Sequence, residues 1–440
     1  MSRKISIGAA LALALLLVAA SIPLTMIYAQ RMFNGVIGDA PARSGENQAI
    51  EEIRKIVSKN FFAGLDRDMM TAGMVRGYIA GLGDEQSRYL SATEYTAYLQ
   101  RLEGAAPDLG LELDYEPGGT EPDTEGETTE AAEAKAGALV IAHVKSGSPA
   151  AASGLLRGDH ILKVQADNKV IFDEKDLKAD NAGEIIKKLG DLATISANTP
   201  SSALTITYRR GAEVKSVSVM IGSAVSSLSW EIMDSWSKDG KSGEPTVGYI
   251  KIFNFYKNTA EQLETAIRSL GDKGAYTYII DLRGCSEGTL EDACKALNPL
   301  VPVSQGSAMA TVTYKDGKKD TYPSDSNNSL FLYTSGGMAV LINGSTSGVA
   351  ELFAYNLRAY HNEVLLVGQK TKGISTIQKA IPLERVGGAA LLSMGRVEPY
   401  HGGADWNADG VQPNEMENGV ELNVKDKDMQ LRNAIEALTK

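Results

Sequence analysis

"LINGSTSGVAELFAYNL", residues 341–357, predicts the end of an apolar strand, a turn of small polar residues and an amphipathic helix. This order of elements often presents a nucleophile at the positive end of the helix. The best-placed position for a nucleophile near the positive end of the helix is the one directly before Glu351, and it holds Ala350. The stretch therefore predicts an α/β fold and leaves open where a nucleophile would lie.

Strands and helices alternate on both sides of this stretch, from Val247 onward. The predicted strands are "VGYIKIF", "YTYIIDL", "MAVLI" and "EVLLVG", and the first helix, "NTAEQLETAIRSL", has Asn258 as its expected cap. Strands this apolar are typical of a parallel sheet buried on both faces, with active loops at the carboxyl ends of the strands. Residues 225–440 are predicted to form one α/β core.

The composition is that of a globular chain with two or three domains. It has 440 residues, of which 43% are hydrophobic and 22% charged, and 44 basic against 55 acidic residues give a formal net charge of -11. This negative charge offers no general attraction to nucleic acid, so no nucleic-acid partner is expected.

Residues 5–29 carry no charge and are long enough to cross a bilayer, so residues 1–30 are interpreted as a cytoplasmic tip and a transmembrane anchor. Arg3 and Lys4 precede the apolar run, which favours a cytoplasmic N-terminus. The alternative is a cleaved signal peptide that ends near Ala29. In both interpretations the bulk of the protein lies outside the cytoplasm. An uncleaved anchor would leave it attached by a single membrane span, and a cleaved signal peptide would release it.

Residues 45–105 have apolar side chains at helical spacing, and Ser91 with Glu94 predicts a capping box before the last helix. Residues 106–224 follow, with an acidic loop at 114–136 that holds few large apolar residues. On either side of that loop, "DLGLEL" and "GALVIAHV" alternate as strands do.

The order of these elements resembles a PDZ domain. In such domains, backbone N–H groups of the loop corresponding to Leu109, Gly110 and Leu111 hold a peptide's terminal carboxylate while the peptide pairs as an added strand. The other interpretation is a small β-rich domain that binds no ligand.

Cysteine and metal chemistry receive little support from the sequence. Cys285 and Cys294 could pair in an oxidising compartment or remain as buried apolar groups. "DWNADG", residues 405–410, copies the start of a calcium loop, but its twelfth position is Met416 rather than a bidentate carboxylate. A loop built on Asx turns is favoured, and neither a metal nor a cofactor is predicted.

Several stretches, taken in order, resemble the C-terminal processing, or tail-specific, serine peptidases. They are "LGDEQSRYLSATEY", "GYIKIFNFYKNTAEQ", "IIDLRG", "LLVGQKTKG" and "DGVQPN". The resemblance covers most of residues 48–440 and implies a helical segment, a PDZ domain and an α/β sandwich, in that order. It also implies a chemistry in which a serine attacks a peptide carbonyl and a lysine accepts its proton.

The site residues that the resemblance implies are largely replaced. Ala350 stands at the serine position and Ile374 at the lysine position, while Gln378 matches the family's glutamine. In the region implied to form the oxyanion hole, from Gly284 to Gly288, Glu287 replaces a glycine, and its carboxylate would repel an oxyanion unless it points away.

Two functions follow as hypotheses. The chain binds C-termini or extended segments of exported or membrane proteins with weak or no proteolysis, or it is an endopeptidase that uses a displaced pair, with Ser347 and Lys372 as substitutes. Under the first hypothesis Ser347 caps the helix and Lys372 is solvated. The sequence leaves the oligomeric state open.

Overall fold

The computed structural model describes most of the chain in two compact units, residues 1–73 and 74–440. The described residues are 21, 25, 26, 28, 40–117, 137–145, 147–166, 169–196, 203–221, 226–233, 246–325, 330, 334, 336–360, 364–399, 406–417 and 428–438. The expected anchor at 5–29 lies almost wholly outside them. Within the described part of the chain, no helix is both long and apolar enough to cross a bilayer.

Within residues 40–102 the helices are α2 (Ala40–Asn60), α3 (Arg67–Ala80) and α4 (Ala92–Leu102), and the short strand β1 (Arg88–Leu90) lies between α3 and α4. The Oδ1 atom of Asp66 accepts the free backbone N–H groups of Asp68 and Met69 at the start of α3. The capping box predicted for α4 is confirmed, since the Ser91 hydroxyl accepts from Glu94 N and the Glu94 carboxylate accepts from Ser91 N.

The central sheet of the core has the strand order β17-β14-β13-β10-β9-β8. Its strands are β8 (Leu228–Met233), β9 (Thr246–Ile252), β10 (Ala275–Asp281), β13 (Met338–Ile342), β14 (Leu365–Gly368) and β17 (Glu415–Met416). All neighbours pair in parallel except β8, which is antiparallel to β9. The predicted parallel sheet is therefore confirmed.

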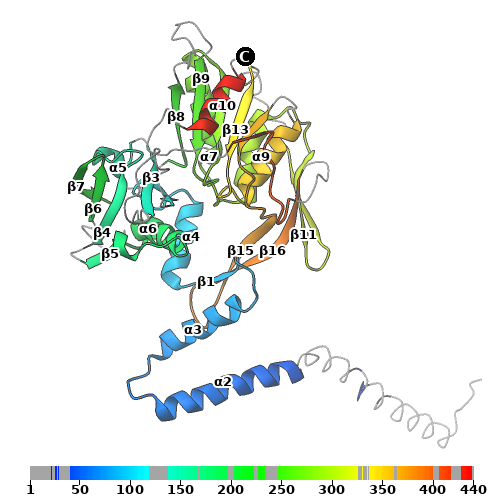
Figure 1. Ribbon diagram of the computed structural model, residues 1–440. Helices are drawn as coiled ribbons and strands as arrows, with labels where there is room; N and C mark the ends of the chain where they lie inside the picture. Colours follow the sequence, from blue (N-terminus) through cyan, green and yellow to red (C-terminus); the bar gives the residue numbers. More distant parts are fainter. Residues whose placement is uncertain are drawn as a thin grey trace, which may run out of the picture. The chain divides into compact units, whose positions relative to one another are not determined.

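Helices cover both faces of this sheet, as Figure 1 shows. One face packs against α7 (Thr259–Asp272), α8 (Leu290–Leu297) and α9 (Val349–Tyr360), and the 3₁₀ turn η2 (Asn298–Leu300) follows α8. The other face packs against α10 (Met429–Leu438). Because alternate strand residues point to opposite faces, all five residues of β13 are buried.

A second, antiparallel sheet completes the core, in the order β1-β16-β11-β12 with β15 added beside β16. Its strands are β1 (Arg88–Leu90), β11 (Ala308–Tyr314), β12 (Lys319–Pro323), β15 (Thr376–Pro382) and β16 (Ala389–Pro399). Strand β1 comes from the segment before α4, so the N-terminal helical segment contributes directly to the core.

Residues 109–221 build a third sheet with its own hydrophobic core. Its path is β2-β3-β4-β6-β7, with β5 beside β4. The elements are β2 (Leu111–Glu116), β3 (Ala138–Val144), α5 (Pro149–Ala152), β4 (His160–Ala166), β5 (Lys169–Asp173), η1 (Glu174–Asp176), α6 (Ala182–Ser196), β6 (Ala203–Arg210) and β7 (Glu213–Met220). Strand β2 runs through Glu116, so the start of the acidic loop predicted at 114 belongs to the strand, and residues 118–136 lie outside the described part.

Candidate functional site

The turn between β13 and α9 is held by Asn343. Its Oδ1 atom accepts hydrogen bonds from Gly284 N and Ser345 N, both at 3.1 Å. The Thr346 hydroxyl donates to the Leu282 carbonyl at 2.9 Å, and Ser347 N donates to the Cys285 carbonyl at 3.0 Å. The turn is thereby fastened to the loop that follows β10, which fixes where α9 begins.

Ala350 is fully buried in the first turn of α9. Beside it, the Glu351 carboxylate accepts from Gly348 N, Gly373 N and Ile374 N at 2.7–2.8 Å and from the Thr371 hydroxyl. Burial raises the pKa of Glu351, and these donors oppose that rise. The carboxylate thus joins the start of α9 to residues 371–374.

This link brings the two positions named by the family pattern onto adjoining segments. Ile374 is half-buried, donates its N–H to Glu351 and accepts a hydrogen bond from Trp406 Nε1 at 3.2 Å. Gln378 lies in β15, where its amide donates to the Thr376 carbonyl and hydroxyl. Its contacts are those of a residue that supports the strand.

The proposed substitute pair lies nearby on separate segments. Lys372 N donates to the Thr346 carbonyl at 3.0 Å, next to Ser347. Ser347 is buried whereas the Lys372 side chain is exposed, and within the described part of the chain no hydrogen bond joins these two side chains. Ala350 N donates to the backbone carbonyl of Ser347 at 3.3 Å, and among the described residues no hydrogen bond joins the Ser347 hydroxyl to the first turn of α9, so the expected side-chain cap is not found there.

In the region expected to hold an oxyanion, Gly284 N already donates to Asn343. Glu287 is exposed and points elsewhere: it accepts from the Tyr256 hydroxyl at 2.7 Å and lies 3.5 Å from Arg101 Nε of α4. Gly288 has φ +147°, and a Cβ there would meet the Phe255 carbonyl oxygen at 2.5 Å. Glu287 therefore anchors α4, and Gly288 permits close approach of two backbones.

Cys285 and Cys294 are both free and buried. Burial raises the pKa of Cys294 to about 12 and that of Cys285 further, so both thiols stay protonated. Of "DWNADG", Asp405 lies outside the described residues, and Asn407 accepts from Ser375 N at 3.4 Å. Among the residues that the structure describes, no group of three His, Cys, Asp or Glu side chains is arranged to hold a metal ion.

A buried charge cluster occupies the carboxyl ends of β9 and β10. Arg283 donates to Asp281 and to Asp428, with nitrogen–oxygen distances of 2.7–3.1 Å. Lys251 lies 3.7 Å from Asp281 and 3.4 Å from Glu112 of β2. Burial would raise the pKa of Asp281, but the Arg283 and Lys251 charges hold it well below its usual range. The sequence offered one clue, since Lys251 interrupts an otherwise apolar strand.

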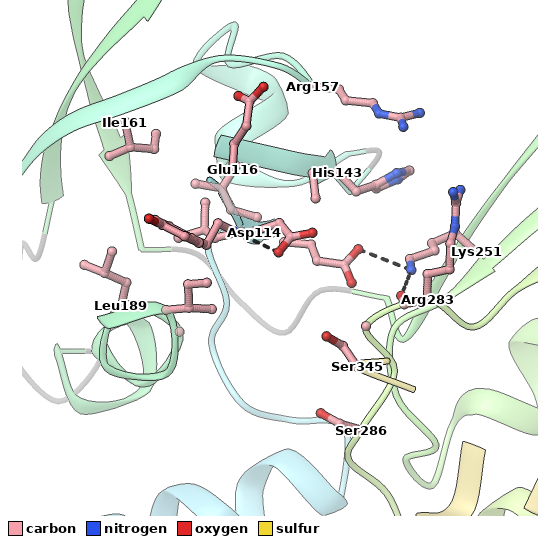
Figure 2. A pocket seen from close by; sticks show the side chains of 18 of the residues that line it. Asp114, Glu116, His143, Arg157, Ile161, Leu189, Lys251, Arg283, Ser286 and Ser345 are labelled. Carbon is pink, nitrogen blue, oxygen red and sulfur yellow. Dashed lines mark hydrogen bonds and ion pairs between the residues drawn. The ribbon is translucent and has the colours of Figure 1, made fainter. Parts of the chain in front are cut away.

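A cavity of about 880 Å³ runs from this cluster to the third sheet (Figure 2). At one end lie Lys251, Asp281, Arg283, Ser286 and Ser345, and at the other the space between β2 and α6. The apolar part is lined by Leu109, Leu111, Leu113, Ile186, Leu189 and Ile206. Neither Ala350 nor Ile374 lines it, so the open space lies away from the positions that the sequence pattern named.

Of the three residues predicted to hold a peptide carboxylate, Leu109 and Leu111 line this cavity, and Gly110 lies between them without lining it. Leu109 O accepts from Ala150 N at 3.0 Å and Gly110 O from Lys145 N at 2.8 Å. Gly110 N donates to Asp108 Oδ1 at 2.9 Å, and Asp108 Oδ2 lies 2.5 Å from Lys145 Nζ. Asp108 and Lys145 were not singled out from the sequence.

Comparison with known proteins identifies the core. The family model for peptidase family S41 matches residues 246–416, the stretch that holds β9 to β17. The chain carries a peptidase family S41 domain. The recognition of a C-terminal processing peptidase relative from the sequence is therefore confirmed.

Named relatives agree with this assignment. The chain is 26% identical over 353 residues to the carboxy-terminal processing protease CtpA of Bacillus subtilis, covering 79% of this chain and 64% of that protein. It is 24% identical over 342 residues to carboxyl-terminal-processing peptidase 2, chloroplastic, of Arabidopsis thaliana, covering 77% and 59%. The chain thus spans only about three fifths of the length of these relatives.

The solved structure of a putative S41 protease from Bacteroides fragilis shares the fold. The two align with a TM-score of 0.52 and 18% identity, over 85% of this chain and 91% of the other. The mixed α/β architecture with several sheets is therefore that of S41 protease structures.

Proposed function

We propose that the chain captures extended segments of proteins in the groove between β2 and α6, and that it does so with weak or no proteolysis. The observation that carries this proposal is the edge position of β2. It pairs with β3 on one side, and its other side faces α6 and the cavity. A free strand edge beside an apolar groove is how peptides are bound by strand addition.

The shape and lining of the groove support a PDZ-like role for residues 106–224. Helix α6 packs against β2, and Leu111, Leu113 and Leu189 offer apolar pockets to alternate side chains of an added strand. Figure 2 shows Leu189 and Ile161 on the side of the cavity opposite Arg283. A bound segment would therefore extend toward the S41 core.

The same proposal assigns no catalysis to the family's serine and lysine positions. Ala350 lacks a nucleophilic atom and is fully buried, and Ile374 cannot accept a proton. Gly284 N, which could otherwise stabilise an oxyanion, is already bonded to Asn343. The second candidate is an endopeptidase using Ser347 and Lys372, and the hydrogen bond from Lys372 N to the Thr346 carbonyl is what favours it.

Location and partners are part of the proposal. The uncharged run at 5–29 would anchor the chain in the cell membrane with its bulk outside the cytoplasm. Exported or membrane proteins, including their C-termini, are then the accessible partners. The relatives named as carboxy-terminal processing enzymes support polypeptide as the class of ligand.

The test blocks the groove. Gly190 lines the cavity on α6, and a Cβ there would meet nothing within 4 Å, so Gly190→Tyr fills the groove without a backbone clash. Gly77→Tyr is the matched control, because Gly77 is also helical, has the same open surroundings and does not line the cavity. Binding of a fluorescent twelve-residue peptide to the full-length chain is measured by anisotropy.

We expect a dissociation constant in the micromolar range, about -8 kcal/mol, since a short peptide buries little area. Gly190→Tyr should weaken binding by about tenfold or more, and Gly77→Tyr should leave it within about twofold. Equal binding by both variants would place the peptide site elsewhere and refute the groove.

A further inference from the structure

In the loop that precedes β2, the side chain of Asp108 already supplies a carboxylate to the loop's hydrogen-bond donors. Asp108 Oδ1 accepts the Gly110 N–H at 2.9 Å, and the second oxygen pairs with Lys145 Nζ at 2.5 Å. These are a backbone donor and a cation, the two kinds of partner that a peptide's terminal carboxylate would need here. Asp108 thus occupies the position that the sequence comparison with PDZ domains reserved for a ligand.

The arrangement is fixed by its surroundings. Gly110 has φ +79°, and a Cβ there would meet the Ser148 side chain at 2.1 Å, so only glycine fits this turn. The Lys145 side chain is 9% exposed, and its Nζ lies 4.6 Å from the centre of the Phe253 ring. A lysine held in this way has little freedom to turn toward a second carboxylate.

Strand β2 adds more negative charge along the groove. Glu112, Asp114 and Glu116 alternate, so they share one face of the strand, and all three line the cavity. Lys251 lies 3.4 Å from Glu112, and His160 lies 3.7 Å from Glu116. Asp114 is exposed and accepts only its neighbour's N–H among the hydrogen bonds of the described residues. An added strand would present alternate side chains to this acidic face.

The cations at the other end of the cavity do not offset the attraction of the acidic face of β2 for basic side chains of a ligand. Arg283 is bonded to Asp281 and Asp428, and Arg157 lies 3.1 Å from Asp428. Their charges are matched within the protein, so a terminal carboxylate arriving there gains little and loses its hydration.

We propose that Asp108 takes the place of a ligand's C-terminus, so that the groove selects internal extended segments carrying lysine or arginine over free C-termini. The inference rests on the proposed function, because it specifies the ligand of the same groove. It departs from the sequence-based expectation for Leu109, Gly110 and Leu111, whose N–H groups were assigned to a peptide carboxylate.

The experiment compares one lysine-containing twelve-residue peptide as the free acid and as the C-terminal amide, on the full-length chain by anisotropy. For the natural chain we expect the two affinities to agree within about twofold. Asp108→Ala frees the Gly110 N–H and Lys145, so the acid should bind about fivefold or more tightly than the amide. Replacing the peptide's lysines by glutamates should weaken binding to the natural chain by about fivefold.

Asp108→Asn guards against loss of the loop, because its amide oxygen still accepts from Gly110 N while Lys145 is released. It should show a smaller acid preference than Asp108→Ala. A natural chain that prefers the acid fivefold, or two folded variants that keep the natural acid-to-amide ratio, would overturn the inference. In either case Gly190→Tyr tests separately whether the groove is the binding site. If this variant binds the peptide as the natural chain does, the groove is not the site and the proposed function fails. If it no longer binds the peptide, the groove is the site and only the role of Asp108 fails.

Discussion

Glu351 connects helix α9 to residues 371–374 through its buried carboxylate, which accepts three hydrogen bonds from that segment and a fourth from Gly348 N. Glu351→Gln leaves an amide NH₂ facing backbone donors, so several buried groups lose their partner. We predict a fall of about 3 kcal/mol in the free energy of unfolding. Chemical denaturation measures it. Glu291→Gln, on the exposed start of α8, is the control and should cost less than about 1 kcal/mol. Similar small effects at both positions would contradict this account.

Residues whose partners are close in sequence were predictable, and residues with distant partners were not. The Ser91 and Glu94 capping box is confirmed because both partners lie within one turn. The cap assigned to Asn258 is wrong in its bonding: the residue precedes α7, but it makes no side-chain cap, and its Oδ1 atom accepts from the Ser227 hydroxyl. A partner 31 positions away in the chain outcompeted the local bond.

At the scale of elements, strands β3 and β8 meet through His143. Its Nε2 lies 3.1 Å from the Ser229 hydroxyl, and its ring centre lies 5.1 Å from that of Phe253. Burial, aided by the nearby Lys251 charge, lowers the pKa of His143 from 6.5 to about 4. In the unfolded chain the same imidazole would titrate near its ordinary value.

This difference predicts a pH dependence of stability. Between pH 6.5 and about 4 the unfolded chain binds a proton at His143 that the folded chain does not, so the free energy of unfolding falls as the pH falls through that window. The contribution is at most about 3 kcal/mol. His143→Gln cannot titrate, so the stability of the natural chain relative to this variant should fall from pH 7 to pH 4. If the free energies of unfolding of the natural chain and of His143→Gln change in parallel between pH 7 and pH 4, the imidazole is not shielded from solvent in the folded chain.

The elements themselves were predicted unevenly. Strands β10 and β13 are continuous apolar runs, and α7 has a regular apolar stripe, so periodicity located them. The three-residue strand β1 pairs with β16 some three hundred positions later, and nothing in its local pattern indicates that partner. The edge position of β2, on which the proposed groove depends, is likewise a property of sheet order rather than of the strand's own sequence.

At the scale of the molecule, the third sheet is joined to the S41 core by charged and polar contacts. Glu112 meets Lys251, Arg157 meets Asp428, and His143 meets Ser229. Each joins residues far apart in the chain, so the sequence could suggest boundaries for residues 106–224 and 225–440 but not the cavity between β2 and the core. The substitutions at Ala350 and Ile374 were readable from the sequence because they depend only on motif spacing.

The central claim is that the chain holds polypeptide without cutting it. The most direct measurement incubates the full-length chain with a labelled, unstructured casein-like protein and scores binding by anisotropy and cleavage by mass spectrometry in the same sample. We predict saturable binding and a substrate whose mass is unchanged after prolonged incubation, with Ser347→Ala and Lys372→Ala behaving as the natural chain does. New fragments that disappear in either variant would contradict the claim and establish a displaced catalytic pair.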